Sequence, residues 1–194
     1  MLWWLRARRV TTYLSGALLA FTVLTVLLQD TVARLPSFLT GGDNPVVAML
    51  LVPVPLYATL LLCLENRLPA EATAVRTVRL WDVGLALATV AAASLVGLVL
   101  GAVLDAPAAL SLGRNTAFLC GLALCVRPLT GPAGVMVPVA WLTAVMLFGF
   151  RQGHPLFWTV LPREPGDPAS LVAATVSLLV GLLALALHRP PTRT

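Results

Sequence analysis

The side chains that could do chemistry are few in this chain of 194 residues, and their spacing is poor for a shared site. Its three cysteines are Cys63, Cys120 and Cys125, and thiolates are good ligands for zinc and other soft metals. Cys120 and Cys125 lie five positions apart, which separates them by roughly 140° around a helix. One helix face therefore cannot bring both to one ion. We expect the cysteines to be small apolar fillers and predict no metal site.

Catalytic motifs are also missing from the sequence. It contains no G-x-S-x-G, no H-E-x-x-H, no phosphate-binding loop and no pair of carboxylates inside an apolar run. Ser15, which precedes Gly16 in the first apolar run, has no side chain nearby in the sequence that could act as its base. We therefore predict no catalytic residue and no bound cofactor. An intramembrane enzyme is the least favoured function class.

The elements that position these residues are apolar runs, with the charges almost entirely confined to the gaps between them. Hydrophobic residues make up 59% of the chain and charged residues 11%. About twenty apolar residues in a helix are needed to cross the ~30 Å hydrocarbon core. The sequence therefore predicts an all-α integral membrane protein, a single domain over residues 1–194 with six transmembrane helices. These spans are expected at 10–28, 46–64, 83–104, 115–129, 133–150 and 171–187.

The arginines give the expected orientation. All thirteen basic residues are arginine, and nine of them lie before span one, between spans two and three, between four and five, or after six. Only Arg34, Arg114, Arg151 and Arg163 fall on the other side. The positive-inside rule then places both termini in the cytoplasm and His154 and His188 on opposite sides of the membrane. The net charge of +5 is thus explained by topology, and no nucleic-acid partner is predicted.

The first nine residues combine Trp3 and Trp4 with three arginines. Indole rings and arginine favour the cytoplasmic interface, so residues 1–9 are expected to lie on the membrane surface or to act as a flanking anchor. A cleaved signal peptide is the competing interpretation. We favour an uncleaved first span, because the apolar run continues unbroken to Leu28 and residues 29–33 form a poor cleavage site.

Prolines mark the second span. Asp43 or Asn44 is expected to cap it, with Pro45 in its first turn. Pro53 and Pro55 each remove a backbone donor, so a kink or local unwinding is expected in mid-membrane. Such a break is compatible with a transport pathway and equally with ordinary packing of a transmembrane helix.

The connector at residues 65–82 is the most polar stretch of the chain. Pro69 can begin a short helix with Glu71 in its first turn, where a negative charge is favourable. Arg76 and Arg79 then share a polar face. We expect a short amphipathic helix on the cytoplasmic surface, or alternatively a solvated loop anchored by Trp81.

The second half of the chain carries three further expectations. Span four is the weakest run and is expected to be tilted or shielded by the others, with Arg114 and Arg127 reaching opposite interfaces. The outer connector at 151–167 is predicted to contain an interfacial or re-entrant element at 156–161. Asp167 and Pro168 should form the cap and first turn of span six.

This topology resembles the membrane subunit of ABC-2 type exporters. The shared features are six spans, internal termini, an arginine-bearing N-terminal segment, the helical connector and an apolar outer element. The resemblance implies that residues 65–82 dock on a separate ATPase subunit through Glu71, Arg76 or Arg79. Six short helices leave little room for an internal pathway, so we expect a dimer of membrane subunits, in which residues 65–82 transmit ATPase motion to the span that Pro53 and Pro55 kink.

We accordingly expect a non-enzymatic permease subunit in the plasma membrane, in contact with lipid. The absence of lysine, with abundant alanine, glycine and arginine, favours a bacterial source. The alternative is a structural or regulatory multi-pass protein that binds a partner and transports nothing.

Overall fold

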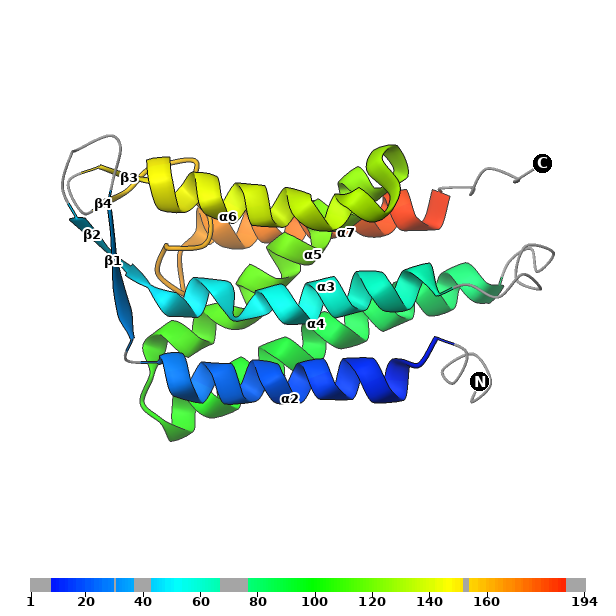
Figure 1. Ribbon diagram of the computed structural model, residues 1–194, viewed down its shortest axis with the longest axis horizontal. Helices are drawn as coiled ribbons and strands as arrows, with labels where there is room; N and C mark the ends of the chain where they lie inside the picture. The colour runs from blue at the N-terminus through cyan, green and yellow to red at the C-terminus, as the bar shows by residue number, and fades with distance from the viewer. Residues whose placement is uncertain (1–7, 30, 37–42, 67–76, 152–153, 188–194) are drawn as a thin grey trace.

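The computed structural model describes residues 8–29, 31–36, 43–66, 77–151 and 154–187. Five helical stretches in this part of the chain are long and apolar enough to cross a membrane, which is consistent with a membrane protein. Figure 1 shows the helices running along the long axis of the molecule. They are α2 (Val10–Leu28), α3 (Pro53–Glu65), α4 (Thr77–Val103), α5 (Leu112–Thr130), α6 (Met136–Phe148) and α7 (Pro168–Leu187).

Short 3-10 helices precede three of these elements: η1 (Ala48–Leu51), η3 (Pro107–Ser111) and η4 (Gly131–Val135). The fourth membrane-length stretch, Pro107–Phe148, contains both α5 and α6. Gly131 has a φ of 59°, a left-handed value that glycine adopts readily, so it ends α5. Figure 1 shows the chain reversing there, with α6 returning toward the other end of the molecule.

The helix at the connector begins earlier than expected. Residues 77–82 form the first turns of α4 instead of the end of a separate amphipathic helix, so this part of the prediction was wrong. A continuous helix satisfies the backbone of these residues within the span. The rest of the predicted connector helix, including Glu71 and Arg76, lies outside the described residues.

The expected cap of span two is also wrong. Asp43, Asn44 and Pro45 belong to strand β2 (Asp43–Val47), which pairs antiparallel with β1 (Val32–Pro36). The residue before a proline is pushed toward extended backbone, and valine favours strands, which together explain the hairpin. A second, shorter pair is β3 (Phe150–Arg151) with β4 (His154–Pro155). Both pairs lie at the same end of the molecule, at the left of Figure 1.

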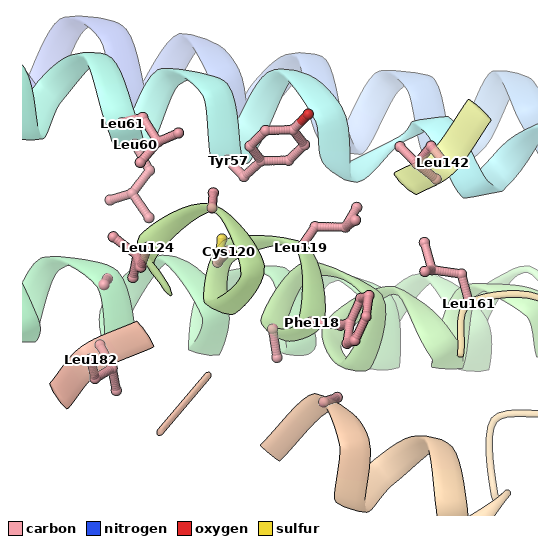
Figure 2. Close-up of a cluster of buried hydrophobic side chains, with 14 of the residues drawn as sticks. Tyr57, Leu60, Leu61, Phe118, Leu119, Cys120, Leu124, Leu142, Leu161 and Leu182 are labelled. Atoms are coloured by element: carbon pink, nitrogen blue, oxygen red, sulfur yellow. The ribbon is translucent and has the colours of Figure 1, made fainter. Parts of the chain in front are cut away.

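Helix α5 lies at the centre of the molecule. It crosses diagonally between the other helices and packs against α3, α4, α6 and α7 (Figure 1). The prediction that the weakest apolar run is shielded is therefore confirmed. Figure 2 shows side chains of α3, α6 and α7 converging on α5 around Leu119 and Cys120, which are 0% and 1% exposed.

Small residues bring α5 and α7 close together. A Cβ on Gly181 would lie 2.6 Å from the carbonyl oxygen of Gly121, so neither helix tolerates a larger side chain there without moving. Ser177 of α7 adds a hydrogen bond of 3.2 Å from its hydroxyl to the Phe118 carbonyl. Close approach through small residues is the usual way for helices to pack in lipid.

The outward faces of the helices are apolar. Leu19 and Leu27 of α2 are 68% and 67% exposed, and Leu179 of α7 is 60% exposed. Exposed leucines over membrane-length helices fit contact with lipid chains. The helices therefore form a bundle whose centre is α5 and whose outer surface suits a bilayer.

Candidate functional site

The most elaborate polar cluster in the described residues surrounds Arg114, which is 7% exposed near the start of α5. Its Nε and Nη2 both donate to Asn115 Oδ1 at 3.2 Å, and Nη1 donates to Ser170 Oγ at 2.8 Å. It also donates to three backbone carbonyls of the outer connector, those of Leu161 (3.0 Å), Arg163 (2.9 Å) and Glu164 (2.6 Å). Its guanidinium N–H groups are thereby all used.

Arg114 does not extend freely into solvent, since its side chain is buried under residues 161–164, and its depth relative to the membrane interface stays a prediction. Its position also opposes the helix dipole, because the N-terminal end of a helix disfavours positive charge. The carbonyl oxygens that accept hydrogen bonds from Arg114 carry partial negative charge, which compensates for this unfavourable interaction with the helix dipole. Arg114 thereby fixes the outer connector against α5 and α7.

Asp167 completes this cluster as the cap of α7, as predicted. Its Oδ2 accepts the backbone N–H of Ser170 at 2.8 Å, and its carboxylate pairs with Arg163 at 3.3 Å. The hydrogen bond from the Ser170 N–H, followed by the Arg163 charge, holds the pKa of Asp167 below its ordinary value. The carboxylate is therefore ionised at neutral pH and stabilises the start of α7.

The expected interfacial or re-entrant element at 156–161 is an irregular segment in the structure, with Val160 and Leu161 buried. Trp158 packs edge-on against Trp141 of α6, with 5.6 Å between ring centroids. Backbone carbonyls of the segment accept hydrogen bonds from Arg114 and Arg163, which is how a non-helical segment becomes stable beside apolar helices.

A cavity of about 520 Å³ lies beside this cluster. Met49 and Leu50 of η1 line one side, Pro107 and Ala108 of η3 another, and residues 161–166 the third. Ser111 and Asn115 contribute polar groups to the wall. We call this space the outer cavity. Its wall comes from η1, η3, the first part of α5 and residues 161–166. These elements lie at the end of the molecule that carries the strands (Figure 1).

A second buried arginine lies at the opposite end of the bundle. Arg8 is 0% exposed and forms an ion pair with Asp82 of α4, with 3.0 Å between Nη1 and Oδ1. It also donates to the carbonyls of Cys63 and Leu64 at the end of α3, at 3.4 and 3.3 Å. Arg8 therefore joins α3 to α4 at the ends that their connector links.

Two further arginines complete this inner clamp, which we define as Arg8, Asp82, Arg79 and Arg127. Arg127 of α5 donates to the Leu64 carbonyl at 3.0 Å, and Arg79 of α4 donates to the Ala186 carbonyl at 3.3 Å. The last carbonyls of a helix lack partners within the helix and carry partial negative charge. Arginines therefore satisfy the ends of α3 and α7.

The structure separates the residues predicted for the site. Arg79 belongs to the inner clamp, whereas Glu71 and Arg76 lie outside the described residues. Pro53 and Pro55 lie in the first turn of α3, directly after η1, where their missing N–H groups cost nothing. The predicted break is thus a junction between a 3-10 helix and an α-helix near the strand-bearing end, next to the outer cavity.

Sequence reasoning missed the roles of Arg8, Arg114 and Asn115. The available signal was a polar Arg-Asn pair directly after Gly113, at the head of the weakest apolar run. Among the described residues no group of three potential metal ligands comes together. No family model, curated protein or solved structure matches the chain.

Proposed function

We propose that this chain is the permease subunit of an ATP-driven exporter in a bacterial plasma membrane, working with a separate ATPase subunit. The observation that carries the proposal is the placement of η1 and α3. They form one helical segment, Ala48–Glu65, that runs from the outer cavity to the inner clamp. A movement of one end of this segment is therefore transmitted to the other end.

The inner end of this segment is held by the carbonyl of Leu64, which accepts hydrogen bonds from Arg8 and Arg127. Its outer end supplies Met49 and Leu50 to the cavity wall. The connector to α4 begins directly after α3, so force applied to the connector acts on α3 first. The junction at Pro53 is the natural hinge, because the 3-10 turn before it has weaker hydrogen bonds.

In this proposal α5 and α6 each cross the membrane, which gives six spans with both termini in the cytoplasm. The beginning of α2 and the end of α7 lie at the same end of the molecule, and this supports an even number of crossings (Figure 1). Arg8, Arg79 and Arg127 are all at that end, in agreement with the positive-inside rule.

The pathway is proposed to lie between two copies of the chain. The centre of one copy is filled by Tyr57, Leu119 and Leu124, each at most 1% exposed. The same filled centre favours the second candidate, a structural or regulatory membrane protein that transports nothing. The two candidates differ in whether an ATPase binds at the connector.

Affinity purification from the native host tests this proposal. We expect a P-loop ATPase to co-purify with the wild-type chain and its activity to rise in the complex. The charge-swapped variant Glu71→Arg with Arg76→Glu should weaken this association, because it reverses the connector's charges while leaving the positive-inside bias unchanged.

Arg127→Gln is the matched control, since it removes a hydrogen bond within the bundle and leaves Glu71, Arg76 and Arg79 intact. It should lower thermal stability without weakening ATPase binding. If no ATPase co-purifies, or if the charge-swapped variant binds and stimulates it as the wild type does, the permease proposal is wrong and the regulatory candidate replaces it.

A further inference from the structure

We propose that the outer cavity is a binding site for an uncharged amphipathic molecule, with an apolar body and one hydrogen-bond acceptor such as a hydroxyl. Binding at this site does not depend on whether the chain transports anything. The inference rests on the size of the cavity, the chemistry of its wall and the hydrogen bonds already made by Arg163 in the wall and Arg114 behind it.

The size and lining of the cavity suit a small organic molecule. Its volume of about 520 Å³ falls within the ~300–1,000 Å³ typical of ligand pockets. Most of the wall is apolar, with few polar side chains, a composition that binds an apolar body and orients it by one or two hydrogen bonds. The apolar lining residues are Met49, Leu50, Pro107, Ala108, Leu161 and Pro162.

Anionic ligands are disfavoured because neither Arg114 nor Arg163 has two parallel N–H groups available for them. Arg114 uses its N–H groups on Asn115, Ser170 and the outer-connector carbonyls. Arg163 pairs with Asp167 and also donates to the carbonyls of residues 157 and 159. An arginine recognises a carboxylate or phosphate through two parallel N–H bonds, and no such pair is available here.

Arg114 and Glu164 place opposite charges near the cavity. Arg114 lies behind the wall, with its Nη1 2.6 Å from the Glu164 carbonyl, and Glu164 itself belongs to the wall. A cationic head group is therefore the competing ligand, because the buried Arg114 repels it and the Glu164 carboxylate attracts it. Labelling with an octylamine probe decides between the two.

Asn115 supplies the hydrogen bond that orients the ligand. The residue is 1% exposed, and its Oδ1 is occupied by Arg114, which fixes the amide so that Nδ2 is the available donor. Nδ2 has only long contacts, 3.4 Å to Ser111 Oγ and 3.4 Å to the Leu161 carbonyl. Both exceed the usual ~2.7–3.2 Å range, so a ligand oxygen in the cavity would make a better partner.

Photolabelling of the full chain in lipid nanodiscs with a diazirine-bearing octanol tests this site. We expect saturable labelling, displaced by unlabelled octanol, that maps to residues 107–111 and 161–166. Ala108→Trp should fill the cavity and abolish the saturable labelling. The matched control Ala102→Trp places the same side chain at an exposed position of α4 away from the cavity, and it should label as the wild type does.

Gly166→Trp gives a second blocking variant with little risk to folding, because a Cβ at Gly166 meets nothing within 4 Å. It should also reduce saturable labelling.

Non-saturable labelling spread over the lipid-facing helices would overturn the proposal, as would equal labelling in both Trp variants at 108 and 102. A diazirine-bearing octylamine that labels more strongly than the alcohol, and loses this labelling in Glu164→Gln, would overturn the assignment of an uncharged ligand.

Discussion

The two buried arginines, one at each end of the bundle, are stabilised in different ways. Arg114 is held by neutral oxygen atoms at 2.6–3.2 Å, from Asn115, Ser170 and the outer connector. Arg8 has a carboxylate partner, Asp82, and its carbonyl contacts are longer, at 3.3–3.4 Å. Among the described residues, the outer end thus uses many short dipolar contacts, and the inner end combines an ion pair with longer hydrogen bonds.

The difference shows what each arginine does for the fold. Arg114 organises an irregular segment by donating to three of its carbonyls, so removing it disturbs residues far apart in the sequence. Arg8 joins two regular helices that already satisfy most of their own backbone, and its charge is paired with Asp82. We therefore expect the outer end to respond more strongly to mutation.

The largest effect is expected for Arg114→Leu. It removes the Arg114 donor from the carbonyls of Leu161, Arg163 and Glu164, although Leu161 keeps a 3.4 Å contact from Asn115 and Glu164 keeps the N–H of Asp167. Hydrogen bonds to a charged group contribute about 1.5–3 kcal/mol each and Arg114 makes several, so we expect a loss of roughly 5 kcal/mol. This loss of stability is measured by thermal unfolding in detergent, with size-exclusion chromatography as the readout. An unfolding midpoint equal to that of the wild type would contradict the role of Arg114.

Asp82→Leu should have the next largest effect, because it removes the carboxylate that pairs with the buried Arg8 at 3.0 Å. We expect a loss near the lower end of the roughly 3–5 kcal/mol typical of a broken buried ion pair. The double variant Arg8→Leu with Asp82→Leu removes both charges and should recover much of the stability. If the double variant is less stable than Asp82→Leu alone, the main role of Arg8 is its bonds to α3 instead of the ion pair.

Asp167→Asn should have the smallest effect, and one confined to a pH range. The folded state holds the pKa of Asp167 below its ordinary value, so the carboxylate stabilises the fold above about pH 4. This contribution disappears as the pH falls through the lowered folded pKa. The variant should be less stable than the wild type near neutral pH, and the difference should shrink in acid. A difference that does not change with pH would contradict this account of the cap.

The sequence predicted the apolar helices well because membrane length and hydrophobicity are properties of continuous segments. The first run matches α2 residue for residue, and the Asp167 cap follows from local chemistry alone. The contacts of Arg114 could not be predicted, since its partners lie about fifty positions away and are mostly backbone oxygens. Every residue has a backbone carbonyl, so the residue types do not reveal which carbonyls Arg114 contacts. Asn44 and Pro45 fit a helix start and a strand equally well, and pairing with β1 decides between them.

Side-specific cysteine labelling tests the central claim that the Arg114 end faces outward and the connector faces the cytoplasm. The starting variant replaces Cys63, Cys120 and Cys125 with alanine, and single cysteines are then introduced at Gly166 or Glu71. A membrane-impermeant maleimide applied to intact cells should label position 166 at once and position 71 only after permeabilisation. Labelling of position 71 from outside, with position 166 protected until permeabilisation, would contradict the account.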